Sequence, residues 1–521
     1  MRWLFSFLAL VLTVAVQAKS FLGPRLLVVL EEQSEKEKYS VLLGDLNGKW
    51  SIVCKRIQLA IVWPERRDIM VYTLNWDPQL LLLGIIKLKR DGWSLEHLLT
   101  LFAIDRGFQT TVESPKADKL SLFRHGERAY DHVILLPGKS KGLGPALTAN
   151  QFLEFMKSDG NVIVALSSSN IVPSSVQSLL LELDIHTPSD KGALVVDHFN
   201  YDSVSAADKH DVLLLPFPDA PRRDVRNFFA GEGILAAPKP VGQVLGNNSP
   251  LLAPILRAPS TAYSYNPKDE ADIVEDPFAT GAQLNIVSSL QSHNSARFTV
   301  VGSAEMLQDQ WFLADAKLNG KAVKTANREF AKKVTEWTFK ETGVLQVGKL
   351  LHYQNEGQNK KLNTSTAVPE NNPTIYRIKE DVAFQVEISE YQNDHLVPFF
   401  PASDDSVQLE FSMLSPFHRL NLSPIGQTAN STIFGVSFKT PDQHGIFNFR
   451  INYRRPFLTN IDEKRQVTVR HFAHDEWPRS WQINGAWPWI GGIWVTVGGF
   501  VAFVAVWLYS APTEKSVKKT Q

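Results

Sequence analysis

Residues 167–170, three serines and an asparagine, stand where an α/β enzyme could carry a nucleophile. They follow the apolar run 161–166, and a nucleophilic serine or cysteine in such a fold lies on a sharp turn between a strand and a helix. The stretch has no cysteine and lacks the G-x-S-x-G frame of that turn. We therefore interpret these side chains as turn caps rather than as a reaction centre.

Three short stretches contain glycine or follow an apolar run and could bind phosphate. None has the residue pattern of a phosphate-binding loop or of a dinucleotide-binding motif. Gly138-Lys139-Ser140 would end a phosphate-binding loop only if a glycine stood five residues earlier, where the chain has Val133. Glu31-Glu32-Gln33-Ser34 follows the first apolar run, where a dinucleotide fingerprint would have glycines. Gly142-Leu143-Gly144-Pro145 is typical of a tight turn. The sequence thus predicts no nucleotide cofactor.

The densest group of ionisable side chains is the run Asp197-His198-Phe199-Asn200-Tyr201-Asp202. It combines acids, a base and a phenol, but it lacks the pair of histidines four residues apart of a helical metal site. We interpret it as a polar strand end or a subunit contact. A glycosidase would need two carboxylates across a cleft, and no such pair can be picked out among 54 acidic residues. The sequence therefore predicts no catalytic, cofactor-binding or metal-binding residue in this chain.

Composition restricts the class of protein. The chain has 521 residues, enough for about two to four domains, and 44% of them are hydrophobic. Its 54 basic residues balance its 54 acidic ones, so no net charge attracts it to nucleic acid. Cys54 is the single cysteine, which excludes an internal disulfide. Stability must come from large cores or from partner subunits.

Apolar segments stand near both ends. Residues 1–18 have one basic residue, an apolar run and small residues at a cleavage position, which predicts a secretory signal peptide. Residues 487–509 carry no charge, and at about 1.5 Å per residue they are long enough for one transmembrane helix. Aromatic residues at its borders and lysines after it predict that residues 510–521 form a cytosolic tail.

The region 19–350 has an α/β pattern. Continuous apolar runs at 25–30, 130–136 and 161–166 are typical of buried parallel strands. Thr148 and Pro173 start helical patterns that end near Gly160 and Leu183. A last helix is expected over 327–342, ended by Gly343.

The region 351–486 has a different pattern. After a polar, Asn-rich stretch at 355–372, short alternating segments are separated by Pro and Gly turns. Such spacing predicts a β-sandwich-like domain close to the membrane. The expected strands are 382–388, 407–411, 433–438, 447–453 and 466–470.

One segment, 47–103, does not fit the α/β pattern. It carries four of the thirteen tryptophans and the single cysteine, and it stands where the first helix of the α/β unit is expected. A loop of this length is unusual inside a compact unit. We interpret it as an insertion or a gene-model error, with residues 44–46 joining naturally to 105–108.

The membrane segment and the tail carry the candidate functional residues. Gly491, Gly498, Ala502 and Ala505 share one helical face, where another helix could approach closely. Lysines at the third and fourth positions from the end, Lys518 and Lys519, resemble a dilysine signal for retrieval to the endoplasmic reticulum. Possible glycosylation sites are the N-x-S/T sequons at Asn247, Asn363 and Asn430.

Eight stretches, in order along the chain, resemble one family. They are RLLVVLEE (25–32), RGFQTTVESP (106–115), LSLFRHGERAYDHVILLP (120–137), GNVIVALSS (160–168), VVDHFNYD (195–202), EWTFKETGVLQVG (336–348), VQLEFSMLSPF (407–417) and PDQHGIFNFRINYRRPF (441–457). This pattern is similar to the beta subunit of the eukaryotic oligosaccharyltransferase complex, the 48-kilodalton or wheat-germ-agglutinin-binding-protein type, in its fungal form. The resemblance covers the chain outside 1–18 and 47–103.

The resemblance implies a function that spacing cannot give. Members are type I proteins of the endoplasmic reticulum membrane, with a glutaminase-like α/β region and a membrane-proximal β region. Their complex transfers a preassembled glycan from dolichyl diphosphate to the asparagine of N-x-S/T sequons in nascent proteins. Catalysis, with its divalent metal, belongs to a different, multi-spanning subunit. The implied partners are that subunit, ribophorin-like and defender-type subunits, and the coat machinery that reads the tail. The alternatives are a lumenal cargo receptor and a stand-alone lumenal hydrolase.

Overall fold

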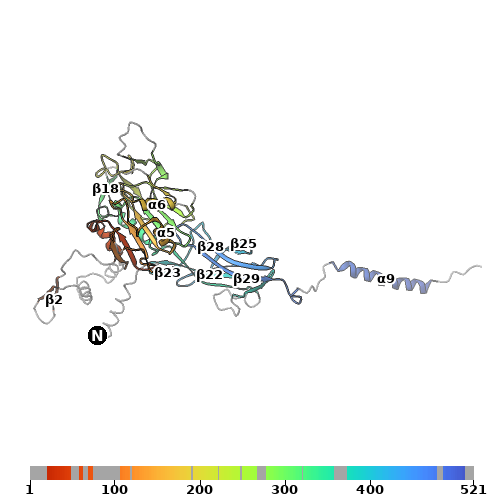
Figure 1. Ribbon diagram of the computed structural model, residues 1–521. Helices are drawn as coiled ribbons and strands as arrows, with labels where there is room; N and C mark the ends of the chain where they lie inside the picture. The colour runs from red at the N-terminus through yellow and green to blue at the C-terminus, as the bar shows by residue number, and fades with distance from the viewer. Residues whose placement is uncertain are drawn as a thin grey trace, which may run out of the picture.

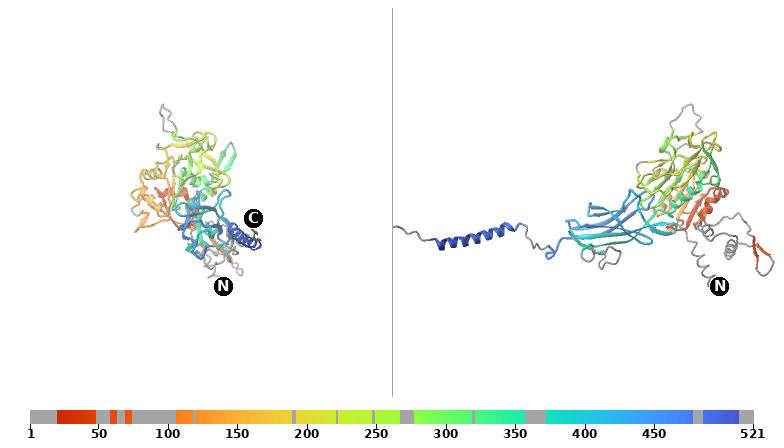
Figure 2. Two further views of the ribbon diagram at one scale, coloured as in Figure 1. Left: turned by 90° about the vertical axis from the view of Figure 1, so that its right-hand side faces the viewer. Right: turned by 180° about the vertical axis from the view of Figure 1, so that it is seen from behind.

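The chain folds into an α/β domain, a β-sandwich and a separate helix, which follow one another in space as in sequence (Figures 1 and 2). This computed structural model describes residues 20–47, 58–62, 69–73, 106–117, 120–188, 192–220, 222–246, 249–266, 277–318, 321–356, 372–477 and 485–510.

A seven-stranded sheet forms the centre of the α/β domain. Its order is β14-β16-β17-β8-β7-β1-β4. The five strands from β17 to β4 are parallel, and β16 is antiparallel to both of its neighbours. The strands are β1 (Arg25–Val29), β4 (Gln109–Glu113), β7 (His132–Leu135), β8 (Asn161–Ala165), β14 (Leu252–Arg257), β16 (Asn285–Gln291) and β17 (Arg297–Val301). The strands expected from the three apolar runs are β1, β7 and β8, and all three are confirmed.

Helices cover both faces of this sheet, because its strands are apolar on both sides. Leu27 and Val29 of β1 belong to a core shared with α5 (Ala149–Lys157) and α6 (Ser174–Glu182). Leu26 and Val28 belong to the opposite core, shared with α2 (Ser40–Asn47) and α8 (Asn327–Thr338). The domain therefore has three layers, as expected of an α/β fold.

Local sequence explains the ends of α5. The Thr148 side chain accepts a hydrogen bond from the Gln151 backbone N–H, as an N-cap does. At the other end Asp159, not Gly160, takes the left-handed conformation, with φ 71°. Gly160 is needed for another reason: a Cβ there would lie 2.3 Å from the Phe155 ring.

Two expected helices differ from the structure. The last helix ends at Thr338 rather than at 342, because Lys340 takes a left-handed φ of 57° and the chain then turns through Gly343. The first helix, α2, precedes the segment 47–103 instead of lying in it. It continues the 3-10 helix η1 (Gln33–Tyr39).

The rest of the α/β domain consists of short elements that sequence patterns did not predict. They are β5 (Phe123–Arg124), β6 (Glu127–Arg128), β9 (Ile185–His186), β10 (Leu194–Val196), β11 (Val212–Pro216), β12 (Ile234–Pro238), β13 (Val244–Leu245), β15 (Tyr263–Tyr265), η3 (Gly281–Gln283), η4 (Glu305–Leu307), α7 (Asp309–Phe312), β18 (Asp315–Leu318) and β19 (Lys321–Lys324). Most form two-stranded ribbons.

The segment 47–103 leaves and re-enters the domain at one place. The Phe108 backbone N–H donates to the Leu46 carbonyl, 3.2 Å away, so the residues before and after the segment are neighbours. Within it the structure describes one hairpin, β2 (Gln58–Val62) paired with β3 (Ile69–Thr73). The adjacency of Leu46 and Phe108 is compatible with both interpretations of the segment, an insertion and a gene-model error.

Two five-stranded sheets form the sandwich and enclose one core. One sheet has the order β20-β22-β27-β26, with β23 beside β22, and the other has the order β21-β29-β28-β24-β25. The strands are β20 (Val344–Gln354), β21 (Ile375–Arg377), β22 (Asp381–Gln392), β23 (His395–Pro398), β24 (Gln408–Ser412), β25 (Pro416–Asn421), β26 (Ser423–Gln427), β27 (Thr432–Lys439), β28 (Gly445–Tyr453) and β29 (Ile461–Arg470). All five expected strands are present, most of them longer than expected.

The change of domain comes earlier than the expected position between residues 350 and 351. β20 already begins at Val344, one residue after Gly343, and pairs with β22 of the sandwich. No linker composition marks this point, because the chain passes directly from the end of the α/β domain into a strand. The Asn-rich stretch near residue 355 instead lies between β20 and β21.

The apolar helix α9 (Trp487–Tyr509) has the bounds expected of the membrane segment. Among the described residues it is the one helix long and apolar enough to cross a membrane, with a mean hydropathy of 2.0, and none of it is buried in the protein. Within the described residues, α9 is thus the single candidate membrane anchor.

Removal of the segment 47–103 tests whether the α/β domain folds without it. Deleting residues 48–104 leaves Asn47, Asp105, Arg106 and Gly107 between the hydrogen-bonded Leu46 and Phe108. Since a long insertion between neighbouring chain ends costs little chain entropy, we expect unchanged yield and thermal midpoint of the full chain in detergent. Deleting α2 instead removes three core leucines and should unfold the protein. Loss of folding in the first variant would show that the segment is part of the domain.

Candidate functional site

The carboxyl edge of the parallel sheet is the usual position of a ligand in this kind of fold. In open α/β sheets, ligands bind beyond the strand ends where the strand order reverses. The first four strands of this sheet along the chain, β1, β4, β7 and β8, lie side by side in the order β4-β1-β7-β8. The reversal therefore falls between β1 and β7, where Glu31 follows one strand and Gly138 follows the other.

The chain's own carboxylate fills this position. Glu31 accepts hydrogen bonds from the Ser140 hydroxyl at 2.5 Å, from the Ser140 backbone N–H at 3.0 Å and from the Lys139 backbone N–H. These bonds, led by that of the Ser140 hydroxyl, hold the pKa of Glu31 below its usual range. Gly138 permits the close approach, since a Cβ there would lie 2.5 Å from the carboxylate. An anionic ligand would have to displace Glu31.

The neighbouring strand ends leave almost no space. A cavity between the ends of β7 and β8, lined by Leu136, Leu166, Ser167 and Asn170 among others, has a volume of about 10 Å³. This is room for about one water molecule. Ligand pockets are typically larger by more than an order of magnitude.

Ser167 is the one serine of its stretch that meets an acid. Its hydroxyl donates to Glu305, and it accepts from the Ser169 backbone N–H at 3.2 Å. Burial raises the pKa of Glu305. Ser167 is itself only 3% exposed, and no histidine among the described residues bonds to either group, so the pair lacks the base and the access of a hydrolase nucleophile.

The acidic run after β10 acts as a strand end, in agreement with the sequence interpretation. Asp197 is buried and accepts from the Phe199 backbone N–H, the Asn200 amide and the Thr261 hydroxyl at 2.8 to 2.9 Å. Although burial alone would raise the pKa of Asp197, these bonds lower it. Asp202 similarly caps the turn that follows.

His198 of this run contacts a second histidine, His210, and a tyrosine, Tyr263. His198 Nδ1 lies 2.5 Å from His210 Nδ1, and His198 Nε2 lies 2.9 Å from the Tyr263 hydroxyl. Across the described part of the chain, no group of three or more His, Cys, Asp or Glu side chains could hold a metal ion.

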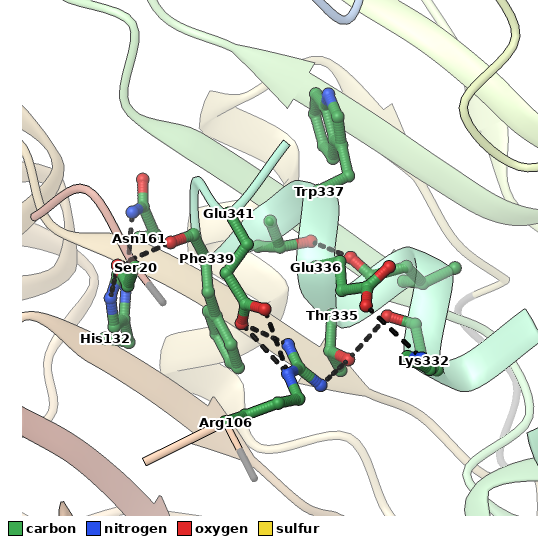
Figure 3. Close-up of polar contacts among 12 residues, drawn as sticks. Ser20, Arg106, His132, Asn161, Lys332, Thr335, Glu336, Trp337, Phe339 and Glu341 are labelled. Carbon is green, nitrogen blue, oxygen red and sulfur yellow. Dashed lines mark hydrogen bonds and ion pairs between the residues drawn. The ribbon is translucent and has the colours of Figure 1, made fainter. Parts of the chain in front are cut away.

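A buried polar network lies at the opposite, amino-terminal edge of the sheet (Figure 3). His132, at the start of β7, bonds through Nε2 to the Ser20 hydroxyl at 2.9 Å and through Nδ1 to the Asn161 amide at 3.2 Å. Ser20 also donates to the Phe339 carbonyl. Complete burial lowers the pKa of His132 to about 3, so the ring is neutral at physiological pH.

A buried ion pair lies beside this network. The Arg106 guanidinium bonds the Glu341 carboxylate at 2.5 to 3.1 Å and the Thr335 hydroxyl of α8 at 2.8 Å (Figure 3). Both charged side chains are at most 4% exposed. Breaking such a pair costs about 3–5 kcal/mol because one charge stays buried alone. The pair fixes the chain just after 47–103 to the end of the domain.

Arg297 connects the sheet to the sandwich. Its buried guanidinium donates to the carbonyls of Trp337, Thr342 and Gly343 and lies 4.8 Å from the Trp337 ring centre. Burial lowers the pKa of Arg297 to about 9, so the cation persists at neutral pH. It satisfies carbonyls at and after the carboxyl end of α8, where a positive charge is favoured.

The loop between β28 and β29 of the sandwich packs against the α/β domain. The Trp337 indole N–H donates to the Phe457 carbonyl at 2.8 Å, and the Phe457 ring meets the Phe229 ring at 5.1 Å. Arg226 of the α/β domain pairs with the buried Glu390 of β22 at 2.5 Å. Trp337, Phe457 and Glu390, which are all buried, thus take part in the contacts that join the two domains.

The candidate residues of the membrane segment lie on α9. At about 100° per residue, Gly491, Gly498, Ala502 and Ala505 fall on one face, and no part of the described protein covers them. Asn430 lies exposed in the turn between β26 and β27. Asn247, Asn363, Lys518 and Lys519 lie outside the described residues.

Comparison with known proteins gives the family. The OST48 N-terminal domain profile matches residues 99–341, and the OST48 middle domain profile matches residues 357–511. A relative in Schizosaccharomyces pombe, the dolichyl-diphosphooligosaccharide–protein glycosyltransferase subunit wbp1, is 34% identical over 418 residues, which cover 79% of this chain and 89% of that protein. The chain belongs to the OST48 family.

Other OST48-family relatives agree. The 48 kDa subunit of the same transferase in Caenorhabditis elegans is 31% identical, covering 78% of this chain and 87% of that protein. The subunit WBP1 of Saccharomyces cerevisiae is 28% identical, covering 77% and 84%. The N-terminal profile begins only at residue 99, although β1 and α2 complete the same domain. The resemblance seen in the sequence is thereby confirmed.

The buried histidine predicts a pH dependence of stability. The pKa of His132 is about 3 in the folded chain and about 6.5 unfolded, so the unfolded state binds the proton more readily. Its contribution to stability is complete above pH 6.5 and declines below it by up to about 1.4 kcal/mol per pH unit. In chemical unfolding of the full chain in detergent, His132→Asn should reduce the loss of stability between pH 7 and pH 5 by about 2 kcal/mol. The exposed His395→Asn should leave it unchanged, and equal slopes in both variants would refute the assignment.

Proposed function

We propose that this chain is a non-catalytic accessory subunit of an oligosaccharyltransferase complex. Such a complex transfers a preassembled glycan from dolichyl diphosphate to the asparagine of N-x-S/T sequons in nascent proteins. The observation that carries the proposal is the similarity to the glycosyltransferase subunits of the two yeasts and the nematode, each over more than three quarters of this chain. In this role the protein supports assembly, stability and full activity of the complex.

The filled carboxyl edge supports a non-catalytic role. Glu31 occupies the position where an α/β enzyme would hold its ligand, and the cavity beside Ser167 fits about one water. We infer that the α/β domain is a glutaminase-like fold without its chemistry, and its β4-β1-β7-β8 strand order is compatible with this origin. The divalent metal of the reaction would then lie on a different, multi-spanning subunit.

We further propose a type I orientation in the endoplasmic reticulum membrane. Residues 1–18 would direct translocation, both folded domains would lie in the lumen, and α9 would anchor them. Lys518 and Lys519 would return the protein through the coat machinery. In the lumen, Asn247, Asn363 and Asn430 would be available for glycans, and the exposure of Asn430 supports this for that sequon.

The small-residue face of α9 would pack against other subunits in the membrane, of the ribophorin-like and defender types. Helices in lipid associate closely where Gly and Ala replace large side chains. No part of the described chain covers this face, so its partner would come from another protein.

Purification and depletion test the function together. The tagged full chain, extracted in mild detergent, should co-purify with the catalytic subunit and other transferase subunits in mass spectrometry. Depleting the chain should lower sequon occupancy on many glycoproteins, because the complex loses a bracing subunit. Co-purifying soluble secretory clients with normal occupancy would instead indicate a cargo receptor. Hydrolytic activity of the partner-free chain would indicate the stand-alone enzyme.

A substitution on α9 tests the packing face. Gly498→Leu adds a large side chain to the face, and we expect the amount of co-purifying subunits to fall several-fold while the chain stays in the membrane. Gly499→Leu is the matched control, since it makes the same change about 100° around the helix. Equal recovery of partners with both variants would contradict the assignment of the face.

A further inference from the structure

The sandwich carries an exposed row of apolar side chains at one end. In the second sheet, Ile375 of β21 and Ile446 of β28 both pair with Thr468 of β29. The pair Ser412 and Asn448 sets the register of β24 against β28, so Leu414, two residues beyond Ser412, continues the same row. We call Ile375, Ile446 and Leu414 the apolar row.

The members of the apolar row face away from the core. Ile375 is 53% exposed, Ile446 is 54% exposed and Leu414, at the tip of the turn between β24 and β25, is 99% exposed. Their sequence neighbours Tyr376 and Phe447 point inward and are buried, as alternation along a strand requires. A single exposed leucine needs no explanation, but three aligned large aliphatic side chains indicate a surface that is covered.

The row lies at the end of the sandwich from which the chain leads to α9. β29 runs past Thr468 to Arg470, and the described chain continues to Trp477. Nine residues lie between Trp477 and Trp487 at the start of α9, so ten residue steps bring the anchor within about 36 Å of Trp477 even if the connection were fully extended. The figures show this end of the sandwich directed toward α9 (Figures 1 and 2).

Aromatic rings and paired charges surround the row at this end. Trp477 is 56% exposed and packs its ring 5.3 Å from Phe472. Two pairs of opposite charges lie at this end, Arg470 with Glu476 at 2.7 Å and Lys379 with Asp442 at 2.8 Å. Exposed tryptophan beside aliphatic residues is typical of a membrane–water interface.

The opposite end of the same sandwich differs. There the turn between β26 and β27 consists of Thr428, Ala429, Asn430 and Ser431, which are small or polar. This turn lies on the side of the α/β domain, since Thr432 pairs with Ile388 near the far end of β22. The turn near the anchor thus carries the exposed Leu414, whereas the turn away from it carries no large aliphatic side chain.

We propose that the apolar row rests in the headgroup region of the bilayer that holds α9, so that the sandwich has a second contact with lipid besides its anchor. Burying apolar side chains at the interface favours this contact, and it would restrict the tilt of both folded domains relative to the membrane. The inference requires the membrane anchor only and does not depend on the transferase function.

Photo-crosslinking in native membranes tests the contact. A benzophenone amino acid replaces Leu414 in the full chain, in cells whose lipids carry alkyne-tagged acyl chains. After irradiation and purification of the chain, we expect at least about fivefold more alkyne label than with the same replacement at Ala429, which lies at the polar turn. Replacement of Trp489 in α9 is the positive control for lipid labelling.

Two results would overturn the proposal. A crosslink from position 414 to another protein would show that a partner covers the row. No adduct at 414, with lipid label at 489, would show that the row lies in water. The replacement at Ile446 serves as a second probe if the chain with the Leu414 replacement is not recovered at the normal level.

Discussion

The relative position of the α/β domain and the sandwich depends on one buried cation. Arg297 begins β17 of the central sheet, and its guanidinium binds the carbonyls with which α8 ends and the sandwich begins. Glu390 of β22 contributes a favourable charge from the sandwich side. Burying a charge costs much free energy unless it stays hydrogen-bonded. These bonds therefore hold the sheet, the helix and the first strand of the sandwich in one relative position. The indole N–H of Trp337 and the Arg106–Glu341 pair reinforce the same junction.

Polar groups connect segments far apart in sequence both at this junction and at the carboxyl edge of the sheet, where Glu31 binds Ser140 and Ser167 binds Glu305. At the junction they connect segments far apart in sequence, such as Ser20, His132 and Phe339. At the carboxyl edge, Glu31 and Glu305 are bound by neighbouring side chains and backbone groups, and little space remains for a ligand. This arrangement is compatible with the proposed non-catalytic role, in which the α/β domain would be a rigid support anchored by α9. The same geometry agrees with a subunit that holds a glycosylating complex together.

Sequence patterns correctly predicted those helices and strands that are determined by interactions between residues close together in the sequence. The apolar runs predicted β1, β7 and β8, Thr148 predicted the start of α5, and the charge-free segment predicted α9 with its bounds. The short ribbons between residues 184 and 326 were missed because two- to five-residue strands have no measurable periodicity. The early start of β20 was missed because no linker precedes Val344. Arg297 was missed as well, since an arginine flanked by strand residues gives no signal of the distant carbonyls that it binds. The contact between Glu31 and Ser140 was likewise missed, because it depends on the order of strands in the sheet, which cannot be deduced from a single sequence.

In the proposed role, this chain supports glycosylation without performing chemistry at its carboxyl edge. Sequon occupancy, measured by mass spectrometry of cellular glycoproteins, tests this role when the only copy of the chain carries Glu31→Gln, Ser167→Ala and Glu305→Gln together. With normal abundance of the altered chain, we expect occupancy equal to that of the unaltered protein. A large loss of occupancy at normal chain abundance would instead place a reaction or an essential ligand at this edge.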